Sequence, residues 1–275
     1  RSRYSVQQNR YIGFVAERLL TVWVEKLERT TPDLVIHETG IISSAQAVIT
    51  PYLDDQSLNG PEHVNLAFAA DRAYLPHAAA MVQSLLANAA PARRYNLFFL
   101  HSSIAPADRA LLDEVVAAYP GATLHHIDAG GQFDDSYRSA SRSPSNTTYN
   151  RFLLFDLLPS LKRLLYVDVD MIFRGDVSEI FDTEMGSHPL AAVTDHIMTR
   201  TLTGATPTID PYVPDLYRYH SDELGLSNDQ IAQYFNAGLL LLNFEAMDVT
   251  ATGRDLMEMA RKGRYLFRDQ DIMNA

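Results

Sequence analysis

Two aspartates stand close together at the end of an apolar run. Asp168 and Asp170 follow Leu164–Val167, with only Val169 between them. If the run is a buried strand, residues two apart point to the same side, about 7 Å apart at their Cα atoms. Two such carboxylates repel each other unless a cation lies between them. Mg²⁺ or Mn²⁺ would relieve that repulsion and bridge the acids to the phosphates of a nucleotide. The pair therefore predicts a metal site, and a turn or helix cap is the ordinary alternative.

The same two acids would also serve a phosphatase of the haloacid dehalogenase type. In that pattern a strand ends in Asp-X-Asp-X-Thr, the first aspartate is the nucleophile and the second is a general acid. This chain has Ile172 where the threonine would stand. That motif also usually lies near the start of its domain, whereas here several strand and helix units precede it. The phosphatase interpretation is therefore disfavoured.

The amino-acid composition excludes several kinds of partner and of chemistry. The 275 residues are 47% hydrophobic and 21% charged, which is typical of a soluble globular protein. The formal net charge of -11 gives no general attraction to nucleic acid, so none is expected as a partner. There is no cysteine, which excludes disulfides and thiolate chemistry. No apolar stretch reaches the roughly 18 residues that span a bilayer, so we expect no transmembrane segment. Peripheral membrane association stays open.

The pattern of apolar residues divides the chain in two. Residues 1–60 are expected to form a helical extension and a linker. Its apolar stripe would pack against the main domain, against another domain or subunit, or against a membrane surface; the stripe consists of Ile12, Val15, Leu19, Val22 and Trp23. Residues 61–275 are expected to form an α/β domain. There, short apolar runs alternate with helical patterns of 10 to 15 residues from about residue 64 to residue 170.

Such alternation indicates βαβ units and a mostly parallel sheet with helices on both faces. The predicted strands lie around residues 64–70, 95–102, 122–128, 163–170, 190–195 and 237–244. Helices are expected between them, one of them over residues 147–159. In open sheets of this kind ligands bind at the carboxyl ends of the strands. Two of the predicted strand ends carry acids, namely Asp71 and the pair Asp168 and Asp170.

Five segments in a fixed order resemble one family. They are "VNLAFAADRAY", "YNRFLLFDLL", "LLYVDVDMIFRGDVSEIF", "YFNAGLLLLNF" and "RDQDIMNA". Together they resemble the family 8 glycosyltransferases, which are retaining enzymes of GT-A fold (a mixed, mostly parallel, Rossmann-like sheet). Bacterial lipopolysaccharide galactosyl- and glucosyltransferases typify the family. The resemblance covers roughly residues 64–275.

The resemblance implies a site for a UDP-sugar. Ala69 and Asp71 correspond to the first strand end, which holds uracil and ribose. Arg151 corresponds to an arginine that contacts the phosphates or the sugar, although by itself it would be interpreted as a solvated arginine on a helix face. Asp168 and Asp170 correspond to the metal-binding pair, with Mn²⁺ usual in the family and Mg²⁺ the alternative. Asp168 is also expected to lie against the bound donor.

The remaining implied residues lie in the second half of the chain. The segment that approaches the donor sugar consists of Asn236, Ala237 and Gly238, where small residues let the backbone come close. Asp269 and Gln270 correspond to the pair at the sugar hydroxyls and the reacting face. Asp195 corresponds to an acid on the acceptor side. Without the family, the small residues would be interpreted as a tight turn and Asp269 as a helix cap.

Two departures from the family pattern are visible. The family's third metal ligand is a histidine in a downstream H-x-x-G-x-x-K-P-W motif, which this chain does not contain. We therefore expect the domain to continue beyond residue 275, or the site to be completed in another way. In addition, residues 7–26 resemble the tail of a different domain found in bacterial surface-polysaccharide proteins. This suggests a multidomain polypeptide.

These observations lead to two hypotheses. The first is a metal-dependent cytoplasmic enzyme, potentially at the inner face of the membrane. It would move galactose or glucose from a UDP-hexose to a glycan or lipid-linked glycan acceptor in lipopolysaccharide or surface-polysaccharide synthesis. The second is a non-catalytic module that binds nucleotide-sugar or glycan within a larger assembly. A sugar-1-phosphate nucleotidyltransferase is disfavoured, because residues 69–77 lack a Gly-rich basic loop.

Overall fold

A computed structural model describes residues 55–102, 104–130, 146–202, 215–263 and 265–275, together with Tyr52 and Phe133. The predicted N-terminal helix lies outside the described residues, as do residues 134–145 and 203–214. The division of the chain at residue 60 therefore stays a prediction.

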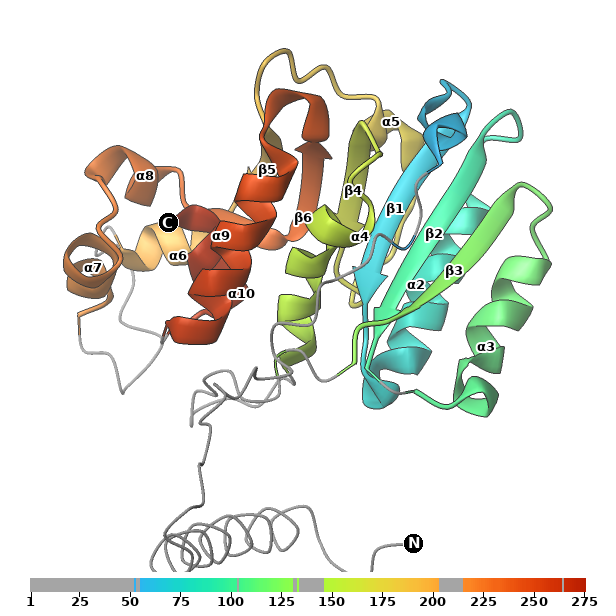
Figure 1. Cartoon of the computed structure of the whole chain (residues 1–275), viewed down its shortest axis with the longest axis horizontal. Helices are drawn as coiled ribbons and strands as arrows, with labels where there is room; N and C mark the ends of the chain where they lie inside the picture. Colours follow the sequence, from blue (N-terminus) through green and yellow to red (C-terminus); the bar gives the residue numbers. More distant parts are fainter. Residues whose placement is uncertain are drawn as a thin grey trace, which may run out of the picture. The chain divides into compact units, whose positions relative to one another are not determined.

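A single six-stranded sheet forms the centre of the described domain, and its strands match the six predicted runs (Figure 1). The strands are β1 (His63–Ala69), β2 (Arg94–His101), β3 (Ala122–Asp128), β4 (Arg163–Val167), β5 (Leu190–Thr194) and β6 (Phe235–Asn243).

The strand order reverses between β1 and β4, in the middle of the sheet. The order is β3-β2-β1-β4-β6-β5, so the chain builds outward from β1 to β3 and then returns to the other side of β1 with β4. The pairs among β1, β2, β3 and β4 are parallel, whereas β6 runs antiparallel to both β4 and β5. The predicted mixed, mostly parallel α/β sheet is therefore confirmed. Ligands in open sheets bind at such a reversal, outside the carboxyl ends of the strands.

Each face of the sheet has its own core. Alternate strand residues point to opposite faces, so Phe98 and Tyr166 lie in one core while Phe99 and Val167 lie in the other. The second core also contains α2 and α3, and the first contains side chains of α4 and α9. Figure 1 shows α2 and α3 together beside β1–β3, and α9 and α10 together near β6.

The helices begin with recognisable local signals. Pro76 stands in the first turn of α2, the carboxylate of Asp248 accepts the backbone N–H of Ala251 at the start of α9, and Ser227 with Gln230 forms a capping box on α8. The α-helices are α2 (Leu75–Ala87), α3 (Pro106–Ala117), α4 (Leu154–Leu157), α5 (Ser178–Phe181), α6 (His196–Leu202), α7 (Leu216–Arg218), α8 (Asn228–Ala232), α9 (Val249–Lys262) and α10 (Asp269–Asn274). Short 3-10 helices are η2 (Gln56–Asn59), η3 (Arg72–Tyr74), η4 (Asn146–Leu153) and η6 (Phe244–Ala246), and η5 (Tyr219–Glu223) is a π-turn.

One expectation about the helices is wrong in detail. The helix expected over residues 147–159 is a 3-10 helix, η4, followed by the single α-helical turn α4. Every side chain from Tyr149 to Leu153 is buried, including Asn150 and Arg151. An amphipathic α-helix would leave one face in water, so the surrounding side chains rather than intrinsic propensity determine the backbone of this segment.

A small lobe lies beside the main sheet. It consists of α6, α7, η5 and α8, and it has a separate apolar core formed by Met198, Leu202, Leu216, Leu226, Ile231 and Tyr234. Both faces of the sheet and this lobe contribute to the site described next. Within the part of the chain that the structure describes, no helix is long and apolar enough to cross a membrane.

Candidate active site

The first part of the site lies where β4 ends and β6 begins. The backbone N–H of Asp168 donates to the carbonyl oxygen of Gly238 at 2.7 Å, which extends the antiparallel pairing past Val167. The side chain of Asn236 folds back and accepts the N–H of Gly238 at 2.7 Å. The structure thus brings together two of the predicted site segments, which are about 70 residues apart in sequence.

Gly238 is required here for reasons of space. A Cβ atom at this position would lie 2.7 Å from Oδ2 of Asp168 and 2.9 Å from Oδ1 of Asn236. Both distances are shorter than any ordinary van der Waals contact. Any larger residue would displace the Asp168 carboxylate, so the small residue serves a packing purpose that is independent of backbone conformation.

Arg151 is the centre of the site's electrostatics. Its side chain is buried, with 3% of the residue exposed, and its Nη2 lies 3.0 Å from Oδ1 of Asp168 and 3.1 Å from Oδ2 of Asp269. Nη1 donates to the carbonyl oxygen of Ala237, and Nε donates to that of Thr148 at 3.0 Å. The interpretation of Arg151 as a solvated surface arginine is wrong, because the chain folds it into the core beneath the two acids.

The aromatic ring of Tyr166 completes the surroundings of this guanidinium. Cζ of Arg151 lies 4.2 Å from the centroid of that ring, a cation–π geometry. Burial by itself would lower the pKa of Arg151, but the charge of Asp269 and further negative groups outweigh it and raise that pKa. Arg151 is therefore permanently charged and serves as a fixed internal cation.

The two acids that share Arg151 remain harder to ionise than ordinary aspartates. Burial raises the pKa of Asp269, and the charge of Asp168 raises it further, against the opposing effect of Arg151. Partial burial likewise raises the pKa of Asp168, and the charge of Asp170 adds to the rise. One guanidinium faces two carboxylates, so the trio carries a net negative charge when both acids are ionised. That charge favours binding of a further cation.

Asp170 has the properties of an available metal ligand. It is exposed, and no described residue forms a hydrogen bond or an ion pair with its carboxylate. Together with Oδ2 of Asp168, which Arg151 does not contact, it offers the oxygen donors that Mg²⁺ and Mn²⁺ prefer. Over the described ranges, no group of three or more histidine or acidic side chains could hold a metal ion. The two acids thus fit a divalent ion that takes its other ligands from elsewhere.

The expectation that a bound cation alone offsets the repulsion between Asp168 and Asp170 is wrong in part. For Asp168, the protein itself supplies part of that offset through Arg151. The metal would therefore add to an existing internal charge pair. That Arg151 also contacts phosphate or sugar stays a prediction, because its described contacts are with protein groups.

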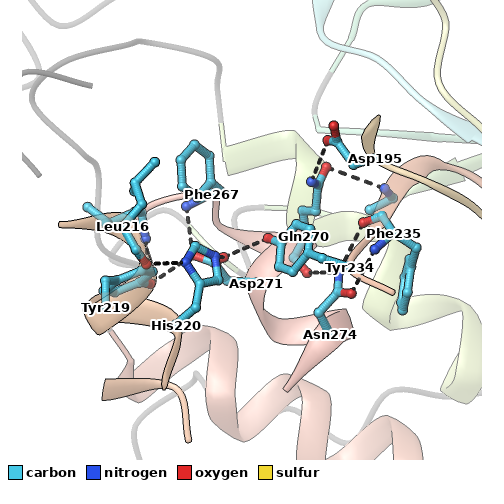
Figure 2. A network of polar contacts seen from close by, with 12 residues as sticks. Asp195, Leu216, Tyr219, His220, Tyr234, Phe235, Phe267, Gln270, Asp271 and Asn274 are labelled. Atoms are coloured by element: carbon cyan, nitrogen blue, oxygen red, sulfur yellow. Dashed lines mark hydrogen bonds and ion pairs between the residues drawn. The ribbon is translucent and has the colours of Figure 1, made fainter. Parts of the chain in front are cut away.

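Gln270 connects the two sides of the site. It lies on α10 next to Asp269, its Nε2 donates to Oδ2 of Asp195 at 3.0 Å, and its Oε1 accepts the backbone N–H of Ala237 at 3.4 Å (Figure 2). The structure therefore brings the pair expected at the reacting face, Asp269 and Gln270, next to Asp195, which was expected on the acceptor side. Their roles in catalysis stay predictions.

Asp195 also has a structural role in the small lobe. Its Oδ1 accepts the backbone N–H groups of Ile197 at 3.1 Å and Met198 at 2.9 Å, so it caps α6. The other carboxylate oxygen is the one that meets Gln270. A single side chain thus links the start of a lobe helix to α10.

Ala69 and Asp71 lie at the neighbouring strand end. Ala67 of β1 pairs with Tyr166 of β4, so continuing that register by two residues places Ala69 beside Asp168. Oδ1 of Asp71 accepts the N–H groups of Ala73 at 2.9 Å and Tyr74 at 3.2 Å, which makes it the cap of η3. Asp71 thus stabilises the turn that follows β1. The contact with uracil or ribose stays a prediction.

Sequence reasoning missed several residues that shape the site. Tyr166 lies against Arg151, and Asp271, two residues beyond Asp269, is fully buried among polar partners drawn in Figure 2. Tyr166 belongs to the apolar run Leu164–Val167, and its hydroxyl group is the only local feature that distinguishes it from the other residues of that run. Asp271 was visible as the second acid of the "DQD" segment, but nothing local indicated that it points away from the metal site.

Comparison with known proteins identifies the family of this chain. A sequence profile described as "Glycosyl transferase family 8" matches residues 65–275. The lipopolysaccharide 1,2-glucosyltransferase of Escherichia coli (strain K12) is 29% identical over 133 residues, which are 47% of this chain and 34% of that protein.

Two solved structures are also similar. The apo structure of the bifunctional glycosyltransferase WbbM aligns with a TM-score of 0.69 and 24% identity, over all of this chain and 47% of that one, which shows the fold alone. The galactosyltransferase LgtC, solved with donor and acceptor sugar analogues, aligns with a TM-score of 0.58 and 25% identity, over 77% of this chain and 69% of that one. The profile match covers most of the chain and includes β1, β4, β6 and α10, and the chain belongs to glycosyltransferase family 8.

Proposed function

We propose that this domain transfers a hexose, galactose or glucose, from a UDP-sugar to a hydroxyl of a glycan acceptor, with retention of configuration. The observation that carries the proposal is the cluster at the ends of β1 and β4. It contains an available acid pair, a small-residue segment and the pair Asp269 and Gln270. The family supports glycosyl transfer in general. The names of the E. coli relative and of LgtC support glucose or galactose, and the former supports lipopolysaccharide as the acceptor class.

In this proposal the acid pair holds a divalent ion. Asp170 and Oδ2 of Asp168 would bind Mn²⁺ or Mg²⁺, which would supply positive charge for the departing UDP. Arg151 keeps Asp168 and Asp269 in fixed positions, because its Nη2 contacts both carboxylates. The carboxylate of Asp269 would then accept hydrogen bonds from hydroxyl groups of the sugar.

The surroundings of Gln270 bear on how the sugar is transferred. An amide is a poor nucleophile, and both ends of this one are already hydrogen-bonded, to Asp195 and to Ala237. This arrangement favours attack of the acceptor from the face that UDP leaves, without a covalent intermediate on Gln270. Gln270 would then orient the reacting groups.

The proposal is tested with a panel of UDP-sugars, Mn²⁺ and an oligosaccharide acceptor from a lipopolysaccharide core. We expect turnover with UDP-galactose or UDP-glucose that is lost on chelation, and at least 100-fold slower turnover for Asp170→Asn because one metal ligand is gone. Asp255→Asn is the matched control, since Asp255 is an exposed acid on α9. An Asp170→Asn variant with near wild-type turnover would refute the metal assignment.

A non-catalytic binding module is the second candidate. It is favoured by one observation, that Asp168 and Asp170 have no third acidic or histidine ligand among the described side chains. Calorimetry with UDP and Mn²⁺ separates the two functions. A binding module gives heat without donor hydrolysis or transfer, whereas the enzyme gives both heat and product.

A further inference from the structure

The carboxylate of Asp271 is fully buried and accepts from several donors at once. Its Oδ2 accepts the hydroxyl of Tyr219 at 2.7 Å and the backbone N–H of Phe267 at 2.8 Å, and its Oδ1 accepts the hydroxyl of Tyr234 at 2.7 Å (Figure 2). Such an arrangement is costly to bury unless every lone pair finds a donor. Burial, with the charge of Asp271 beside them, raises the pKa of both tyrosines, so they remain donors.

His220 provides the fourth contact. It is also fully buried, with Nδ1 2.8 Å from the carbonyl oxygen of Leu216 and Nε2 3.3 Å from Oδ1 of Asp271. A carbonyl oxygen can only accept, so Nδ1 carries a proton. Nε2 is the ring atom that faces the acid, but it has no hydrogen-bond partner among the described residues, so the ring packs against Asp271 while Nδ1 is bonded to α7.

These partners belong to the small lobe, whereas Asp271 belongs to α10. Tyr219 and His220 lie in η5, and Tyr234 lies in the apolar core of the lobe. The same lobe carries Asp195, the partner of Gln270. Asp271 therefore joins the lobe to α10 at one point, and the bond between Gln270 and Asp195 joins them at a second point that lies in the site.

The helix α10 needs external contacts to keep its orientation. It has only six residues, too few for a helix to be stable alone, and it follows Arg268, which has a φ of 55° that a side-chain-bearing residue rarely adopts. Asn274 bonds reciprocally to the backbone of Phe235, Gln270 bonds to Ala237, and Asp271 bonds to the lobe. Gln270 and Asn274, four residues apart, hold one side of the helix to the start of β6, and Asp271 holds another side to the lobe.

We propose that Asp271 is a positioning residue. It holds α10 against the small lobe through Tyr219, His220 and Tyr234, and this keeps Gln270 on Asp195 and Asp269 on Arg151. The inference rests on the proposed transferase function for its kinetic consequence. The structural part of the inference is that Asp271 restrains the start of α6 and the start of β6, and this part does not depend on the transferase function.

The kinetic test compares variants of Asp271 with a control of similar burial. Asp271→Ala leaves its donors without an acceptor, and we expect kcat per folded molecule to fall about 10- to 100-fold, the effect of displacing reacting groups by an ångström. The KM for the UDP-sugar should change far less, because the acid pair and the β1 end are untouched. Asn96→Ala removes a buried hydrogen bond to Asn65 in β1, far along the chain from α10, and should leave kcat unchanged.

Asp271→Asn separates positioning from direct chemistry. Its amide oxygen can accept from Tyr219 and Phe267 while its NH₂ donates to the hydroxyl oxygen of Tyr234, so most of the network persists. We expect Asp271→Asn to recover most of the activity that Asp271→Ala loses. An asparagine variant as slow as the alanine variant would assign the carboxylate a chemical role and overturn the proposal. Tyr219→Phe and Tyr234→Phe each remove one hydroxyl and should cause smaller losses in kcat, so the test does not depend on Asp271→Ala folding.

Hydrogen–deuterium exchange of the full chain without substrate supplies a readout that needs no turnover. In the Asp271 and tyrosine variants we expect faster exchange in residues 196–199 and 235–238, which Asp271 does not contact, but not in Asn96→Ala. Unchanged exchange in both segments would overturn the proposal. If the wild-type protein turns over no UDP-sugar, the proposed function fails, and the exchange data alone decide whether Asp271 positions α10.

Discussion

Nη2 of Arg151 lies 3.0 Å from Oδ1 of Asp168, inside the protein and directly behind the acid expected to bind a metal ion. The same nitrogen contacts Asp269 at 3.1 Å. The conformations of the metal-site acid and of the acid expected at the sugar are therefore linked through one side chain. A change at Arg151 should affect folding and both parts of the site together.

Arg151→Ala should destabilise the fold strongly. It leaves the carboxylates of Asp168 and Asp269 without their shared cation, and breaking a buried ion pair in this way typically costs about 3–5 kcal/mol. Urea unfolding measures the change. The matched control is Arg218→Ala, since Arg218 is 76% exposed and lies 3.8 Å from Asp222, a geometry worth under about 1 kcal/mol. Equal losses for the two variants would contradict the central role of Arg151.

Stability should depend on pH through Asp269. An acid whose pKa is raised on folding binds its proton more tightly in the folded state. Its stabilising contribution is thus complete below the unfolded value of about 3.8 and is lost as the pH rises through the folded pKa. Asp269→Asn removes that dependence. The free energy of unfolding of the wild type minus that of the variant should fall as the pH rises above about 4, measured by urea titration at each pH. A difference that rises with pH would show that the pKa of Asp269 is lowered instead.

Gly238→Ala should disturb the acid pair without touching it chemically. The new methyl group would lie 2.7 Å from Oδ2 of Asp168, so that carboxylate must move. We expect weaker binding of Mn²⁺ with UDP by calorimetry and a loss of about 1–3 kcal/mol in stability. Gly175→Ala is the control, because a Cβ there meets no atom within 4 Å. Unaltered binding in Gly238→Ala would mean that Asp168 is not a ligand.

The two oxygens of Asp195 can be tested separately. Asp195→Ser keeps an acceptor for the N–H groups at the start of α6 but is too short to meet Gln270, whereas Asp195→Ala loses both contacts. The serine variant should be more stable than the alanine variant by about 1 kcal/mol, the usual value of a helix cap. Both variants should lose transferase activity to a similar extent, because each releases Gln270. An active serine variant would show that the contact with Gln270 is dispensable.

Local sequence patterns determined much of the architecture. Apolar runs bounded by turn residues located all six strands, and alternation with helical patterns predicted a largely parallel sheet. The spacing of Asp168 and Asp170 predicted the acid pair, whereas the resemblance to a family predicted the small-residue segment and the pair Asp269 and Gln270. These features are readable because strand and helix periods, turns and short motifs depend on neighbours within a few residues.

Tertiary structure decided how those segments meet. The ionic contact of Arg151 with Asp168 spans 17 residues, its bond to Ala237 spans 86, and the bond between Tyr219 and Asp271 spans 52. Nothing local marks Arg151 as buried, makes β6 antiparallel to β4 or turns Asp271 toward His220. Such pairings depend on the free energy of packing whole segments together and satisfying their buried charges. For this reason the sequence by itself indicated which residues are candidates for the site, and only the folded chain determined which of them hold the others in place.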